Sequence, residues 1–237
     1  MGYYDNKHIS KEEAEKELKQ HWVPRWLNEK NIYDWLNEET NIPYLKLDVS
    51  IPWDDIYKEA LAIKDQCVVH RKPDGGGTWK SICIHGIDAE YTDDWMYYEQ
   101  YKGKSEPEYK WTWVSEKCPI TTNFFKEKFP YKSYRRLRFM WIEPGGYILP
   151  HQDDLERCLH PINISIYNPK DCEFRYKNWG TVPFTNGSAF LIDTGQKHSV
   201  WNKSKEARLH IIASGKKDLP RFLEILERSW INAPHQS

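Results

Sequence analysis

The feature that most constrains the fold is a succession of short, strand-like segments that begins near residue 80 and ends near residue 215. These segments are rich in β-branched and aromatic residues, and Pro, Gly, Asn or Asp stands between them. Short strands at this spacing are typical of two packed antiparallel sheets. We therefore predict a mainly β fold, a double-stranded β-helix (jelly roll, cupin-like) with flanking helices. The segments are WKSICIHG, YKWTWV, YRRLRFMWIEP, INISIY, CEFRY, SAFLID, KHSVWN and ARLHIIAS.

Helical patterns precede this β-rich region. Residues 10–39 begin with a capping box, formed by Ser10 and Glu13, and continue in two pieces that Pro24 separates. Residues 51–66 carry apolar side chains at helical spacing and lead into a short β-branched run, CVVH. We expect these helices to pack on the outside of the sheet.

Two further segments complete the predicted organisation. Residues 87–108 are polar and aromatic without a clear period, as in a long loop that covers a site. Residues 219–230 place four apolar side chains on one helical face, which can cover the core or form a homodimer contact. We predict one domain over 1–237, with 1–66 mainly helical and 134–215 as the jelly-roll core. The four apolar residues are Leu219, Phe222, Leu223 and Leu226.

Composition argues against several classes of function. The 34 basic and 35 acidic residues leave a formal net charge of -1, so we expect no nucleic-acid partner. No apolar stretch approaches the length that a bilayer requires, and the first residues lack the apolar core of a signal peptide. We therefore expect a cytoplasmic protein without membrane contact. The five cysteines include no CxxC pair, which argues against a disulfide framework or a thiolate zinc site.

The segment GYILPHQDD contains the first candidate metal ligands. His151 and Asp153 are two residues apart, so on an extended chain both side chains project from the same face. One imidazole and one carboxylate can then share an ion. An HxD triplet alone is a weak signal, because it also occurs in polar turns such as one that could follow Pro150.

His198 is the candidate third ligand. It follows the turn TGQ and opens a strand, and we expect that strand to reverse at NKSK and return as ARLHIIAS. Two histidines and one carboxylate form the facial triad of non-haem iron(II) oxygenases, which leaves positions on the metal open for other ligands. Zinc can bind the same three side chains, and a buried structural role for His198 is the alternative.

Arg208 lies ten residues beyond His198, on the returning strand of that expected hairpin. With a loop of odd length, both residues would fall on the same face and point into the barrel. An inward arginine is a costly unpaired charge unless a carboxylate meets it, and a bidentate contact with a dicarboxylate is the natural use of such a group. The alternative is a surface arginine near Lys205 or Glu206.

The motif order, HxD followed by a distal His and then Arg, resembles the 2-oxoglutarate and iron(II) dependent oxygenases. The surrounding segments EPGGYILPHQD, LHPINISIYNP, GSAFLIDTGQKHSVWNKS and ARLHIIASG are similar to those of the aspartyl/asparaginyl β-hydroxylase and proline hydroxylase group. The resemblance covers roughly residues 134–215 and is specific for the cofactor chemistry, but it does not identify the substrate.

This resemblance implies that His151, Asp153 and His198 hold Fe(II) and that Arg208 binds the far carboxylate of 2-oxoglutarate. The aspartyl β-hydroxylases proper have a glycine where this chain has Asp153, and the halogenating relatives also lack the carboxylate. Asp153 therefore favours hydroxylation. Asn163 is a candidate helper at the co-substrate, as are His160 and His210, although a satisfied structural polar group is the usual role of such residues on a strand.

The resemblance thus predicts a dioxygenase that uses O2 to hydroxylate an unactivated C–H bond of a small-molecule or peptide substrate, an amino acid or a peptidyl residue first among them. One alternative is a jelly-roll module that binds carbohydrate or another ligand without redox activity. Another is a zinc hydrolase or cupin-type isomerase built on the same triad.

Overall fold

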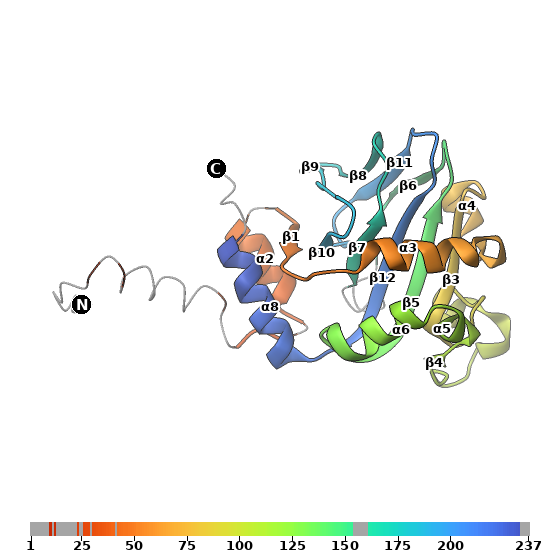
Figure 1. The fold of residues 1–237 in the computed structure, drawn as a ribbon, viewed down its shortest axis with the longest axis horizontal. Helices are drawn as coiled ribbons and strands as arrows, with labels where there is room; N and C mark the ends of the chain where they lie inside the picture. The colour runs from red at the N-terminus through yellow and green to blue at the C-terminus, as the bar shows by residue number, and fades with distance from the viewer. Residues whose placement is uncertain are drawn as a thin grey trace.

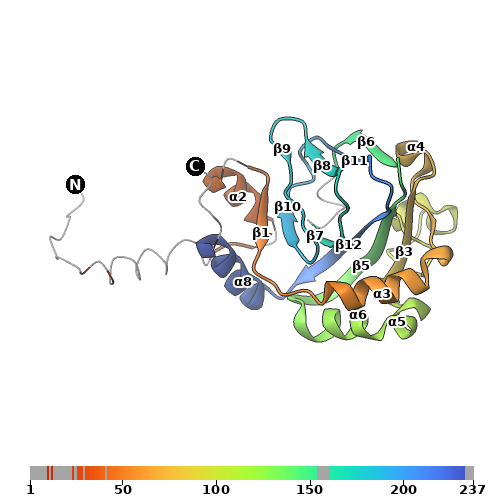
Figure 2. The same cartoon turned by 45° about the horizontal axis from the view of Figure 1, so that its top comes forward.

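Two antiparallel β-sheets face each other in the computed structural model (Figures 1 and 2). The structure describes residues 10, 12, 23, 26–28, 30–40, 42–153 and 161–232. The larger sheet has the strand order β1-β10-β7-β12-β5-β3-β2, with β4 beside β3. Its strands are β1 (Tyr44–Leu47), β2 (Val68–Val69), β3 (Trp79–Gly86), β4 (Lys110–Trp111), β5 (Tyr131–Ile142), β7 (Ile162–Tyr167), β10 (Ala189–Ile192) and β12 (Arg208–Lys217).

The smaller sheet has the order β6-β11-β8-β9. Its strands are β6 (Tyr147–His151), β8 (Cys172–Tyr176), β9 (Gly180–Thr181) and β11 (His198–Asn202). The two sheets and the flanking helices confirm the predicted double-stranded β-helix.

Helices cover the outer face and one end of the larger sheet. In Figure 2, α3, α5 and α6 lie on the side of this sheet that faces away from the smaller one, while α2 and α8 lie together beside β1. The rings of Trp35 and Trp230, 5.2 Å apart, join α2 to α8. The helices are α2 (Ile32–Thr40), α3 (Trp53–Ala62), α4 (Lys72–Gly75), α5 (Trp113–Lys117), α6 (Pro119–Asn123) with a π-helical turn (Phe124–Lys128), and α8 (Leu219–Asn232); short 3-10 turns cover Lys64–Gln66, Trp95–Tyr97 and Glu99–Tyr101.

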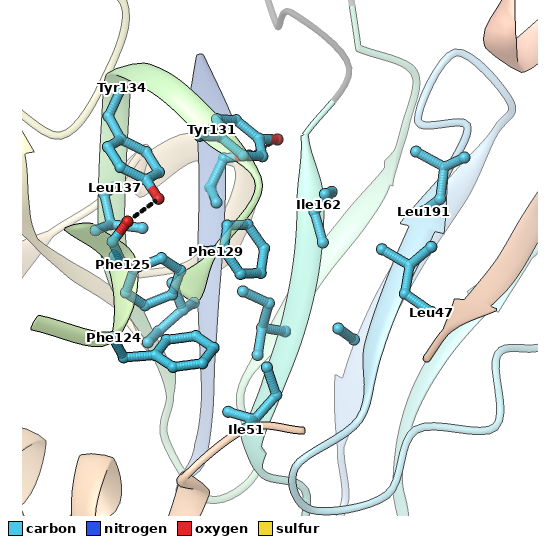
Figure 3. Packing of buried hydrophobic residues seen from close by; sticks show 14 of the residues in the cluster. Leu47, Ile51, Phe124, Phe125, Phe129, Tyr131, Tyr134, Leu137, Ile162 and Leu191 are labelled. Carbon is cyan, nitrogen blue, oxygen red and sulfur yellow. Dashed lines mark hydrogen bonds between the residues drawn. The ribbon is translucent and has the colours of Figure 1, made fainter. Parts of the chain in front are cut away.

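The larger sheet separates two apolar cores. On its outer face, side chains such as Phe125, Leu137 and Ile162 pack under the helices (Figure 3), and the Tyr134 hydroxyl donates a 2.7 Å hydrogen bond to the carbonyl of Phe125. A second core lies between the sheets; it contains Ile142, Ile148, Phe174 and Val200. Successive side chains of a strand point to opposite faces, so each central strand supplies both cores. On β7 the isoleucines face the helices, which leaves Asn163 to face the space between the sheets.

The structure adds detail to the predicted organisation. Besides its helices, the region 1–66 contributes strand β1 to the larger sheet. The apolar face of α8 is a core face, since Phe222 and Leu226 are fully buried within this chain. Glu13 of the expected capping box, Cys158 and His160 lie outside the described residues. Among the described residues, none of the helices has the length and apolar content that crossing a membrane requires.

Candidate active site

His151, Asp153 and His198 meet between two paired strands of the smaller sheet. β6 and β11 are antiparallel neighbours, and His151 lies directly opposite His198 in their register. Asp153 follows β6, where its backbone N–H donates a 2.9 Å hydrogen bond to the carbonyl of Thr194. The ligand atoms of the three side chains all lie within 4.8 Å of one another. Within the described part of the chain, no other group of three His, Cys, Asp or Glu side chains is arranged to hold an ion.

Both imidazoles are oriented by backbone carbonyl groups. Nδ1 of His151 donates to the carbonyl of Leu149 (2.7 Å), and Nδ1 of His198 donates to that of Gln196 (2.8 Å). In the neutral form of each ring Nδ1 therefore carries the proton, which leaves the Nε2 lone pair for a metal; metal-binding histidines commonly make such an outer hydrogen bond. Phe174 stacks against His198, with the ring centroids 5.0 Å apart, and fixes the plane of the imidazole.

The electrostatic environment favours a neutral His198. Its side chain is buried, and this burial, followed by the adjacent His151, lowers the pKa of His198. A neutral imidazole is the form that binds metals.

The spacing of the three side chains fits a divalent ion. Ligand atoms at right angles around an ion, each about 2.1 Å from it, are about 3 Å apart. Nε2 of His151 and Oδ1 of Asp153 are 3.7 Å apart, so a small side-chain adjustment brings them to bonding distance. Two neutral imidazoles and one carboxylate on one side of an ion leave its other side open to the pocket, which matches the facial triad.

Arg208 lines the same pocket, but the strand that carries it belongs to a different sheet from the one predicted. The expected hairpin of β11 and β12 is wrong: β11 pairs with β6 and β8, whereas β12 pairs with β5 and β7 in the other sheet. The chain crosses between the sheets after Asn202, whose side-chain amide donates to the carbonyls of Ile142 (3.0 Å) and Glu206 (2.7 Å). His198 and Arg208 still share a pocket, because the inner faces of the two sheets face each other.

Arg208 is deeply buried and has no carboxylate partner among the described residues. Only 3% of it is exposed. Its Nε donates to Oδ1 of Asn168 (3.3 Å), its Nη2 lies 2.7 Å from Nδ1 of His210, and its guanidinium lies 5.8 Å from the ring centre of Phe184. Burial lowers the pKa of Arg208 to about 10, so it still carries its charge at neutral pH. A buried cation of this kind is costly without an anion, and none of the described residues supplies one.

Asn163 and His210 stand beside Arg208. Nδ1 of His210 lies 2.6 Å from Oδ1 of Asn163 and 2.7 Å from the guanidinium, so the three side chains form a chain of contacts. Burial, and then Arg208, lower the pKa of His210 well below its usual value, which keeps the ring neutral. Nε2 of His210 has no hydrogen-bond partner in the described structure. The two residues hold Arg208 in place, and both also line the pocket.

Three further arginines line this pocket. From its strand position in the sequence, Arg138 is the alternative candidate for binding the co-substrate, whereas Arg71 and Arg136 have no predicted role. Arg136 and Arg138 are buried on the inner face of β5, and Arg71 lies between β2 and α4. The signal was present in the segment YRRLRFMWI, where Arg136 and Arg138 alternate with apolar residues on a strand. Apolar walls supplied by Ile148, Val200 and others complete the pocket.

Comparison with known proteins identifies the family. The model of the aspartyl/asparaginyl beta-hydroxylase family matches residues 52–218, well over half of the chain and all of the pocket described above. The chain belongs to this family. It is therefore an oxidoreductase, a 2-oxoglutarate and iron(II) dependent dioxygenase, and the predicted cofactors are confirmed at the level of the family. Membership of this family also argues against the alternative that the chain is a binding module without redox activity.

Solved structures similar to the enzyme include a prolyl-4-hydroxylase from Pseudomonas putida, with 11% identity over 77% of this chain and 96% of that chain at a TM-score of 0.44. An oxidoreductase of the 2OG-Fe(II) oxygenase family from Burkholderia pseudomallei has 11% identity over 81% and 94%, at a TM-score of 0.46. A viral collagen prolyl hydroxylase from Paramecium Bursaria Chlorella virus-1 has 12% identity over 72% and 94%, at a TM-score of 0.38. No curated protein matches the chain.

Proposed function

We propose that this enzyme hydroxylates an unactivated C–H bond of an amino acid or a peptidyl residue, with His151, Asp153 and His198 as the iron ligands and Arg208 as the residue that binds 2-oxoglutarate. The observation that carries the proposal is the convergence of the three ligand side chains and a buried, unpaired Arg208 on one pocket. Asp153 supports hydroxylation over halogenation, because its carboxylate occupies the position that a halide would need.

Fe(II) and 2-oxoglutarate supply the oxidation, in which O2 is consumed and 2-oxoglutarate becomes succinate and CO2. The residues of this chain position the reactants. His151 and His198 offer their Nε2 atoms because their Nδ1 atoms are engaged by backbone carbonyls. Arg208 offers a planar pair of donors that suits the far carboxylate of the co-substrate, with Asn163 and His210 fixing its orientation.

The pocket walls supply the remaining requirement, exclusion of water from the reacting centre. Ile148, Ile192 and Val200 line the pocket beside the triad, and Phe174 covers one face of His198. An apolar surround of this kind limits unproductive turnover of a reactive centre.

The proposed substrate is a free amino acid, a peptide or a small metabolite, in that order of preference. We also propose that the enzyme works in the cytoplasm, without a nucleic-acid or membrane partner.

A mass-spectrometric screen tests the proposal. The iron-loaded enzyme is incubated with amino acids, short peptides and cell extract, with and without 2-oxoglutarate, and products heavier by one oxygen atom are sought. The expected result is a product that requires iron and 2-oxoglutarate together and that is absent with the variant His198→Ala. Lys205→Gln, a change at an exposed position of the loop before β12, is the matched control and retains the product. A product that forms without 2-oxoglutarate contradicts the proposed function.

A further inference from the structure

Arg136 and Arg138 form a second cationic end of the pocket, remote from Arg208. Both are buried, with 5% and 7% exposed, on the inner face of β5. Nη1 of Arg138 donates a 2.5 Å hydrogen bond to the carbonyl of Thr92, and the Nε atoms of both arginines have no partner in the described structure. Two guanidinium groups with unused donors therefore face a cavity from the same strand.

The carboxylates nearby do not balance these charges. Asp93 accepts two hydrogen bonds from Arg71, from Nε (2.8 Å) and Nη2 (2.7 Å). Arg136 lies 3.9 Å from Asp94 and 4.0 Å from Asp93. Arg138 has no carboxylate oxygen within 4.0 Å among the described residues. Asp94 also lies 3.7 Å from Arg135, which in turn pairs with Glu106 at 2.6 Å. Among the described residues, these four guanidinium groups therefore meet three carboxylates, and one positive charge remains without compensation.

The co-substrate does not supply the missing anion. Fe(II), the Asp153 carboxylate, the two carboxylates of 2-oxoglutarate and Arg208 together form a neutral set. In the register of β12 with β5, Arg208 lies opposite Ile142, whereas Arg138 lies opposite Ile212. Four residues along a strand correspond to about 13 Å between the Cα positions. The two arginines therefore enter the pocket from well-separated backbone positions, which favours a separate anion for each.

We propose that Arg138, with Arg136 beside it, binds a carboxylate of the substrate. The inference rests on the proposed function, and it names the class of substrate: an acid that enters the pocket with its carboxylate at β5 and presents a C–H bond toward the triad. The carboxylate is either the α-carboxylate of a free amino acid or the side-chain carboxylate of a peptidyl residue, since a guanidinium recognises both in the same way.

The electrostatics and the neighbouring segment support this assignment. Burial, and then the adjacent Arg136, lower the pKa of Arg138 to about 10, which leaves it charged at neutral pH and in need of an anion. Thr92, Asp93 and Asp94 belong to the segment 87–108 predicted to cover a site, so this segment contacts the cationic end directly.

A binding experiment tests the inference without catalysis. The enzyme is loaded with Mn(II) in place of iron and saturated with 2-oxoglutarate, so that Arg208 is already engaged. Binding is then followed by isothermal titration calorimetry with three matched probes: L-amino acids as free acids, the same amino acids as α-amides, and N-acetylated peptide amides that contain either Asp or Asn. We expect the acids of at least one series to bind ten- to a hundredfold more tightly than their neutral counterparts, and this preference to disappear in Arg138→Gln.

The series that shows the preference identifies the source of the carboxylate. Discrimination between free acids and α-amides indicates an α-carboxylate, and discrimination between Asp and Asn peptides indicates a side-chain carboxylate. Lys132→Gln, which removes one exposed charge from the same strand, is the matched control and keeps the preference. Arg138→Lys keeps part of it and provides the test if Arg138→Gln does not fold.

Equal binding of acids and neutral analogues by the wild type overturns the inference. So does a loss of 2-oxoglutarate binding in Arg138→Gln with the probes unaffected, because Arg138 would then hold the co-substrate. Succinate release by the iron-loaded wild type in the presence of the amino acids and peptides of the screen tests the proposed function separately. A failure of that reaction is therefore distinguishable from a failure of this subsite.

Discussion

Replacement of Arg208 by alanine gives the sharpest prediction about co-substrate binding. The guanidinium is almost fully buried, and its contacts in the described structure are neutral: Asn168, His210 and the ring of Phe184. In Arg208→Ala the far carboxylate of 2-oxoglutarate is desolvated with no cation to meet it, a loss on the order of 3–5 kcal/mol. At about 1.4 kcal/mol per tenfold change, co-substrate binding weakens roughly a hundredfold to a few thousandfold. Iron binding changes little, because Arg208 lies outside the triad.

The assay is the KM for 2-oxoglutarate, measured with iron content for the wild type and three variants. Arg208→Lys recovers only part of the loss, since one ammonium group does not reproduce the planar pair of donors of a guanidinium. Lys205→Gln removes an exposed charge three residues away and leaves KM unchanged. A wild-type KM in Arg208→Ala refutes the reasoning and assigns the co-substrate to another cation, with Arg138 the first candidate.

Three further predictions concern other parts of the molecule. Asp153→Gly abolishes hydroxylation but keeps some iron, since two imidazoles remain; product assays and metal analysis check this, and full activity would exclude Asp153 as a ligand. Burial alone would raise the pKa of Asp93, but the hydrogen-bonded Arg71 outweighs it and lowers that pKa to about 2. The stability that the Asp93–Arg71 pair contributes is therefore present above pH 4 and lost toward pH 2. Urea unfolding of the wild type should show the free energy of unfolding fall by about 2 kcal/mol between pH 4 and pH 2, and Asp93→Asn should lack this decrease. Gly215→Ala destabilises the fold by about 3 kcal/mol, because a Cβ there would lie 2.2 Å from the backbone oxygen of Ser133, and an unchanged melting temperature would contradict this.

The sequence predicted the double-stranded β-helix because short strands separated by turn residues are typical of two packed sheets. It predicted the triad because the HxD spacing brings His151 and Asp153 close together, and because the order of HxD, distal His and Arg resembles that of the family; the pairing of β6 with β11 that brings His198 to them is a long-range contact. The pairing of β11 with β12 was predicted wrongly because adjacency in the chain does not reveal which sheet a strand joins. Asn202 opens the crossover, and its three side-chain hydrogen bonds to backbone carbonyls become visible only in the folded chain.

The cationic end of the pocket shows a different limit of the sequence. Arg136 and Arg138 stand on one face of a strand, but alternation alone does not say whether that face is buried. Their importance depends on which carboxylates reach them, and Asp93 and Asp94 come from a segment without periodicity. That none of the described carboxylates pairs with Arg138 becomes visible only from long-range contacts.

Succinate formation from 2-oxoglutarate is the most direct test of the central claim that this enzyme uses iron and 2-oxoglutarate at His151, Asp153 and His198. The metal-free enzyme is reconstituted anaerobically with Fe(II) or Zn(II), exposed to O2 with 2-oxoglutarate and the amino acids and short peptides of the screen, and assayed for succinate. The wild type with Fe(II) is predicted to release succinate in an amount equal to the 2-oxoglutarate consumed, while the Zn(II) form and His198→Ala release none. Succinate release that persists in His198→Ala, or a wild type that releases none with Fe(II), would contradict the account.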